Sequence, residues 1–273
     1  EGGGAVAFPV MTLLLHVAPP IARNFSLACQ SFGMTSASLW IVDRKIPFER
    51  QVVAPVSLGG VIGLVASTHT AAVWLPPPHT KLFFVSTWLA FGAALFAVNR
   101  RAGRAVIDAL PPLEVTDRAK LFGCGLVGGA ITAVLGNGID IFTFTVLTLH
   151  FRLSEKVATP TSVLLMTANT LVGFGYHAAI LRDVQPEAWW SLLAVIPVVT
   201  VMAPLGAWTI DKLPRLGVVW ILLVIIVVQF VGALGVIRPS GPLLAYTAAV
   251  FVVTALGFRA ITRSSFVDPV RDR

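Results

Sequence analysis

The chain has 273 residues, of which 56% are hydrophobic and 12% are charged, and its mean hydropathy is +0.84. Soluble domains carry about 25% charged residues, so this composition excludes a soluble domain and predicts a polytopic helical membrane protein. The net charge of +7 does not indicate a nucleic-acid partner, because the Lys and Arg residues lie in short segments between apolar stretches.

The chain begins at Glu1, directly before the glycines at positions 2, 3 and 4. A related glycine motif near residue 138 follows an apolar run over 120–135, whereas nothing comparable precedes Gly2. We therefore expect that a stretch of about 15–25 residues, the size of one further apolar segment, is missing before Glu1.

Several apolar stretches are long enough for the roughly 20 residues that a helix needs to cross a bilayer. The segment 22–42 is less apolar than the others but still long enough. The remaining predicted spans are 52–74, 82–98, 158–180, 189–210, 217–237 and 242–258.

The stretch 119–151 is either one long span or two short helices that meet at glycines and return to the same side. Counting Lys and Arg decides between them, since these residues favour the cytoplasmic side. With the return, sixteen of the 20 Lys and Arg residues fall on one side, and without it the split is ten against ten. The charge count therefore predicts a returning hairpin.

A sequence pattern occurs twice, in residues 2–27 and 138–163, at a constant offset of 136. Gly2 matches Gly138 and Ser26 matches Ser162, and apolar positions mostly match apolar ones. Glycine-interrupted apolar segments in corresponding places of two halves indicate the binding site of a transporter.

With the return at 119–151, the segment after the first motif starts outside and its counterpart starts inside, so the two repeats are inverted. The predicted fold is an all-α polytopic membrane protein with two inverted repeats. Each has a glycine-broken helical hairpin followed by spanning helices, and an extra C-terminal helix completes the chain. The expected parts are a first repeat (1–98), a cytoplasmic connecting loop (99–118), a second repeat (119–237), and a final helix with a cytoplasmic tail (238–273).

The two motifs offer donors to an anion. Glycines permit a helix to stop and turn, and the free N–H groups at the start of the next half-helix favour negative charge. Hydroxyl residues follow each motif, among them Ser26, Thr161 and Ser162. The alternative is that these small residues only let membrane helices pack closely or bond their own backbone.

Asp140 is the one acid within a strongly apolar stretch apart from Glu1 at the chain start. It either carries a coupling proton or ion or caps the turn that follows it. Its counterpart in the first repeat is Gly4, so the two halves do not share this role. Arg23, just before a span, either attracts an anion or extends toward the interface.

The duplicated unit resembles the TauE/SafE family of sulfite exporters, which are membrane permeases with two related halves. The resemblance rests on the segments GGGAVAFPVMTLLLHVAPPIARNFSLA and GLVGGAITAVLGNGIDIFTFTVLTLHFRLSEKVATPTS. Asn137 and Asp140 depart from the unbroken glycine run that is usual in the family, and Asn24-Phe25-Ser26 stands where a Thr-Ser pair is common. The resemblance implies export of sulfite or a related organosulfonate across the bacterial inner membrane.

Together these observations predict a secondary transporter for a small sulfur-containing anion, working by alternating access, with its C-terminus in the cytoplasm. The coupling ion, proton or sodium, and a homodimeric state are open. The alternatives are a passive channel or permease for another small anion, an intramembrane enzyme, and a scaffold subunit. We find no catalytic nucleophile, metal-ligand spacing or cofactor motif, so we expect no enzyme, cofactor or metal. The expected substrate-binding residues are Gly2, Gly3, Gly4, Asn24, Ser26, Gly136, Asn137, Gly138, Thr161 and Ser162, with Asp140 as the coupling candidate.

Overall fold

The computed structural model describes residues 8, 10–74, 76–99, 107–213 and 215–263. Their regular structure is helical, and the one β-bridge among them is isolated. In chain order the elements are η1 (Val10–Leu14), α2 (Pro19–Asp43), α3 (Arg50–Thr68), α4 (Ala71–Trp74), α5 (Pro77–Asn99), α6 (Val115–Leu135), α7 (Ile139–Leu149), α8 (Glu155–Gly175), η2 (Tyr176–Leu181), α9 (Pro186–Lys212), α10 (Arg215–Ile237) and α11 (Gly241–Arg263).

The fold is that of a polytopic all-α membrane protein, as the composition predicts. Seven of the helices in the described part of the chain are long and apolar enough to cross a membrane. α2 is not among these seven, although its 25 residues give it sufficient length. The predicted span 52–74 is too long, because α3 ends at Thr68 and the short α4 follows.

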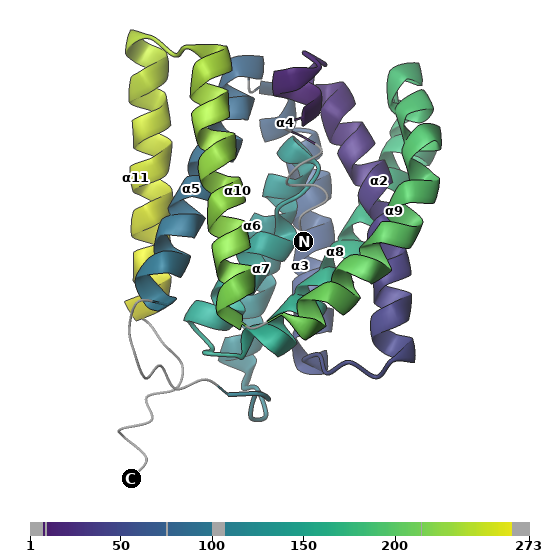
Figure 1. The fold of residues 1–273 in the computed structure, drawn as a ribbon, viewed down its shortest axis with the longest axis vertical. Helices are drawn as coiled ribbons and strands as arrows, with labels where there is room; N and C mark the ends of the chain where they lie inside the picture. Colours follow the sequence, from purple (N-terminus) through teal and green to yellow (C-terminus); the bar gives the residue numbers. More distant parts are fainter. Residues whose placement is uncertain (1–7, 9, 75, 100–106, 214, 264–273) are drawn as a thin grey trace.

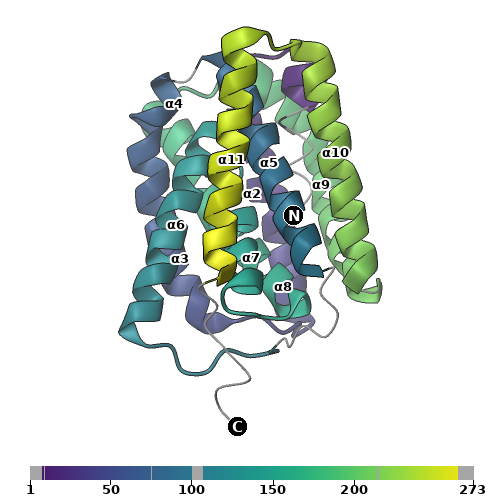
Figure 2. The same cartoon turned by 90° about the vertical axis from the view of Figure 1, so that its left-hand side faces the viewer.

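The long helices run roughly along one axis of the molecule (Figure 1). α5, α10 and α11 form one side and α2 and α9 the other, with α3, α6, α7 and α8 between them. Seen from the side, α11 and α10 cover α5 (Figure 2). α2, α5, α7, α9 and α11 run downward in Figure 1, and α3, α6, α8 and α10 run upward.

The stretch 119–151 consists of two helices that return to one end of the molecule. α6 has 21 residues and α7 has 11, so the first helix is a full-length one rather than a short one. The return is fixed by the segment before α6, where Ile107 N–H donates to the carbonyl of Arg152 at 3.0 Å. Ser154 N–H donates back to the carbonyl of Ile107 at 2.7 Å.

The turn between α2 and α3 lies at this same end. The Glu49 carboxylate accepts a hydrogen bond from Leu110 N–H at 2.9 Å, and the Gln51 side chain accepts one from Leu113 N–H at 3.1 Å. The basic segments 43–51 and 152–157 and the described part of 99–120 therefore lie at one end of the molecule. The count of Lys and Arg with a returning hairpin places these three segments on one side of the membrane.

α3 and α6 pack through glycines that let the two backbones approach closely. A Cβ atom on Gly63 would lie 2.0 Å from the carbonyl oxygen of Leu126, and one on Gly129 would lie 2.0 Å from that of Gly60. Such close contacts between small residues are the main attractive packing that membrane helices have, because lipid tails are as apolar as the side chains.

We expect Gly63→Ala to lower the free energy of unfolding by about 1–3 kcal/mol, because the added methyl forces α3 and α6 apart. Gly123→Ala on α6 is the matched control, since a Cβ there meets no atom within 4 Å. Thermal unfolding in detergent measures both. Equal melting temperatures for the two variants would contradict this account of the contact.

Candidate functional site

The break between α6 and α7 requires glycine at two positions. Gly136 ends α6 with φ of 78° and Gly138 precedes α7 with φ of 145°. A Cβ on Gly136 would lie 2.6 Å from the carbonyl oxygen of Arg23, and one on Gly138 would lie 2.5 Å from Cγ2 of Ile131. Both the backbone angles and the space therefore exclude larger residues.

The backbone groups of the break are satisfied by side chains. Gln30 Nε2 donates to the carbonyl of Gly136 at 2.8 Å, and Ser26 Oγ donates to the same oxygen at 3.3 Å. On the other side, Ile139 N–H donates to Thr132 Oγ1 at 3.1 Å. The predicted residues Ser26 and Gly136 are thus in direct contact across α2 and α6.

Polar side-chain atoms without a hydrogen-bond partner are buried at the break. Both amide atoms of Asn137 and Oδ1 of Asp140 are in this state, and each residue is 1% exposed. Asn137 lines a cavity of about 20 Å³ together with Thr87 of α5, whose hydroxyl is also buried without a partner. Aromatic and aliphatic side chains, such as Trp88 and Ile141, form most of its other walls. The space suffices for about one water molecule.

Asp140 lies in the first turn of α7, with its carboxylate near the backbone amides of Gly138, Asp140 and Ile141. A negative charge at a helix N-terminus is favourable, so these contacts support the capping role. The second carboxylate oxygen, which has no partner, leaves the coupling role as a proposal.

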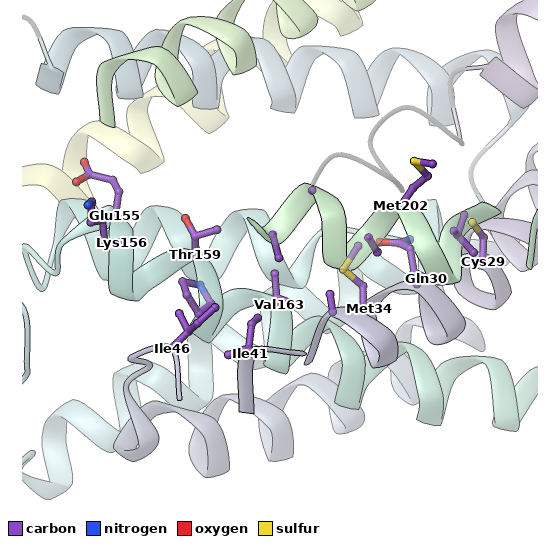
Figure 3. A pocket seen from close by; sticks show the side chains of 17 residues that line it. Cys29, Gln30, Met34, Ile41, Ile46, Glu155, Lys156, Thr159, Val163 and Met202 are labelled. Atoms are coloured by element: carbon purple, nitrogen blue, oxygen red, sulfur yellow. The ribbon is translucent and has the colours of Figure 1, made fainter. Parts of the chain in front are cut away.

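A larger cavity of about 320 Å³ lies between α2, α8 and α9 (Figure 3). Gln30 and Cys29 lie at one end, and Glu155 and Lys156 at the other. Gln30 therefore contacts both this cavity and the glycine break.

The other sequence-predicted residues lie in different surroundings. Asn24 Nδ2 donates to the carbonyl of Asp183 at 3.1 Å and to Gln185 Oε1 at 3.0 Å. Thr161 accepts a hydrogen bond from Glu49 N–H at 2.9 Å, at the turn that leads into α3. Ser162 donates to the carbonyl of Thr159 in its own helix at 2.8 Å. The predicted residues Gly2, Gly3 and Gly4 lie outside the described residues.

Arg23 is buried and paired with an acidic side chain. It is 7% exposed, and its guanidinium lies 3.6 Å from the carboxylate of Asp183. The same carboxylate bonds His177 Nδ1 at 2.8 Å. This cluster ties the start of α2 to the segment between η2 and α9.

Two buried amides near the break were not among the sequence-predicted residues. Gln30 is 2% exposed, and Asn169 of α8 is fully buried with both amide atoms unpartnered. The side-chain oxygen of Asn169, Oδ1, lies close to Gly60: a Cβ on Gly60 would be 2.9 Å from it. In the sequence, each could have been noticed as a single amide side chain within an apolar helix. Burying an amide in a membrane costs at least as much free energy as burying a hydroxyl.

A bundle of apolar helices with a broken helix at its centre defines the chain as a polytopic membrane protein with an internal polar site. Comparison with protein families assigns it further: the model of the sulfite exporter TauE/SafE family matches residues 1–234. The chain belongs to this family of membrane transporters. No curated protein and no solved structure matches the chain.

We expect Asp183→Asn to destabilise the protein by about 1–3 kcal/mol, because Arg23 is left buried without a countercharge. The estimate is at the low end for a buried pair, since the Asp183 side chain is 42% exposed. Asp43→Asn is the control, because its partner Arg44 and Asp43 itself are largely exposed and such pairs contribute little. Thermal unfolding distinguishes the two, and equal losses would contradict a structural role for the Arg23 pair.

Proposed function

We propose that the protein is a secondary transporter that exports a small sulfur-containing anion, sulfite or an organosulfonate, across the inner membrane by alternating access. The observation that carries the proposal is the buried glycine break, with its unpartnered Asn137 amide in the interior of an apolar bundle. Broken helices at membrane depth are tolerated where they are buried in protein or line a cavity, and transporters use them to bind substrate.

The substrate would bind at the break through weak donors. Asn137 Nδ2 is a buried donor, and the start of α7 carries the partial positive charge of a helix N-terminus. No full positive charge among the described residues contacts Asn137 in this arrangement. Donors of this kind hold an anion without trapping it, which suits a site that must release its cargo.

The order of the helices supports two inverted repeats. The sequence offset of 136 relates the first residues of α2 and α8, Pro19 and Glu155, and those of α3 and α9, Arg50 and Pro186. Within each pair, one helix runs down and the other up in Figure 1. Inverted repeats provide two mirror-related arrangements of one unit, as alternating access requires.

In this scheme Ser162 is the counterpart of Ser26. Ser26 donates a hydrogen bond to the glycine break of the second repeat, between α6 and α7. We propose that Ser162 and Thr161 serve the first break, with Gly2, Gly3 and Gly4, in the opposite access state. Asp140 has no acidic counterpart, so a coupling role for it would be confined to the second repeat.

We expect Gly138→Leu to reduce saturable sulfite flux in proteoliposomes at least tenfold, because leucine cannot adopt the backbone angle at this position. Gly123→Leu is the control, since position 123 of α6 has open space beside it. Absence of sulfite and sulfonate flux in the wild type would overturn the cargo assignment. Flux that rises linearly with sulfite without saturating would favour a channel.

If Asp140 carries the coupling proton, Asp140→Asn should abolish the response of sulfite flux to an imposed pH gradient while exchange of sulfite across the membrane continues. The reason is that an amide fills the same space but cannot take up a proton. A gradient response that persists in Asp140→Asn would leave this carboxylate with the capping role alone.

The proposed orientation places the α2–α3 turn in the cytoplasm and the start of α9 outside. Single cysteines replacing Arg44 and Glu187, in a chain with Cys29 and Cys124 replaced by serine, should report opposite sides to a membrane-impermeant maleimide added to intact cells. Labelling should occur at position 187 only. Labelling at position 44 instead would reverse the orientation.

A further inference from the structure

We propose that the cavity between α2, α8 and α9 binds the transported anion on its way to the glycine break. It takes the anion in its singly charged, protonated form, hydrogen sulfite, and Gln30 recognises the proton. This inference rests on the proposed function, since it takes sulfite as the cargo. It adds the site of entry and the protonation state of the ligand.

The orientation of the Gln30 amide is fixed by its neighbours. Its Nε2 lies 2.8 Å from the carbonyl oxygen of Gly136 and 3.1 Å from that of Ser26. Both partners are acceptors only, so the amide nitrogen must face them and the amide cannot be flipped. Oε1 is consequently left as a buried acceptor without a partner, on a residue that lines the cavity.

An unpartnered buried acceptor selects for a ligand that donates a hydrogen bond. Leaving such a group unsatisfied costs free energy, and a donor on the ligand removes that cost. Hydrogen sulfite carries one proton and one negative charge, whereas fully ionised sulfite has only acceptors. Gln30 therefore discriminates between the two protonation states of the same ion.

The charges of the cavity point the same way. The charged side chains among the lining residues are Glu155 and Lys156, whose charges cancel, and most of the others are apolar, such as Met34, Val163 and Met202. The cost of transferring an ion into a poorly polar space rises with the square of its charge, so a dianion costs about four times as much as a monoanion. The volume of about 320 Å³ accommodates a small oxyanion with several waters.

Other titratable groups lie near Gln30 or the cavity. Their effect on the pH dependence of binding must be distinguished from the effect of the ligand's own proton. Cys29 of α2 lines the cavity, and α9 contributes no titratable group to it. Asp140 lies beyond the glycine break. The cluster of Arg23, Asp183 and His177 lies about two turns before Gln30 on α2 and in the segment before α9. Methanesulfonate serves as the reference ligand, because it is a monoanion at all working pH values and has no donor.

The test is equilibrium binding of radiolabelled sulfite to the purified full chain, with methanesulfonate measured by competition. Hydrogen sulfite ionises near neutral pH, so the affinity for total sulfite should fall about five- to tenfold between about pH 6 and about pH 8. The affinity for methanesulfonate should stay constant and be lower than that for hydrogen sulfite, on the order of tenfold. Parallel pH profiles for the two ligands would assign the titration to the protein and overturn the proposal.

A pair of glycine variants tests whether the ligand binds in this cavity. Gly206→Leu adds a side chain where a Cβ meets no atom within 4 Å, on a residue that lines the cavity, and should weaken sulfite binding at least tenfold. Gly232→Leu in α10 also enters open space, away from the cavity, and should bind as the wild type does. Equal binding by both variants would place the ligand elsewhere.

Gln30→Met keeps the size of the side chain but removes the acceptor. It should bring the ratio of hydrogen sulfite to methanesulfonate affinity close to one, whereas a purely structural role would weaken both ligands alike and leave the ratio unchanged. Sulfite flux with an unchanged ratio would overturn this inference alone. An absence of both flux and binding in the wild type would instead overturn the proposed function.

Discussion

The arrangement depends on satisfying the backbone of a helix that stops inside an apolar bundle. A carbonyl or N–H group left unpaired in such an environment costs several kcal/mol. The structure meets this requirement with side chains from two directions: Gln30 and Ser26 bond the Gly136 carbonyl, and Thr132 accepts from Ile139 N–H. α2 is thereby joined to the α6–α7 break by specific bonds, in addition to apolar contact.

The close packing of α3 on α6 prepares the place where α7 begins. Because glycines bring these two helices together, Ile139 fits into a space bounded by Gly60 and Gly128. A Cβ on Gly60 would lie 2.4 Å from Cδ1 of Ile139, and one on Gly128 would lie 2.9 Å from its Cα. The first residue of α7 is thus held by two glycines on different helices. The glycines of α3 and α6 therefore position the break as well as stabilise the bundle.

Much of this architecture follows from the sequence, but only part of the site does. The composition is sufficient to identify the membrane class, and the distribution of Lys and Arg is sufficient to choose the hairpin over a single span for 119–151. Gly136 and Gly138 were identifiable because only glycine tolerates their backbone angles. The full length of α6 could not be predicted. Its first turn is polar and includes Asp117, so the sequence does not mark this turn as part of an apolar span.

The contacts of single polar residues were less predictable, since they depend on how the helices are rotated. Thr161 and Ser26 occupy nearly equivalent positions in the repeat, yet one bonds the turn before α3 and the other bonds the glycine break. Arg23 pairs with Asp183, which is 160 positions away in the sequence. No local sequence pattern indicates such a pair. Nothing in the sequence singles out Gln30, and only the position of the Gly136 carbonyl makes its amide a fixed group. Its amide nitrogen bonds the backbone of the break, and its amide oxygen is a buried acceptor without a partner on a residue that lines the cavity. A ligand that bonds the oxygen therefore acts on the same rigid group that holds the break in place.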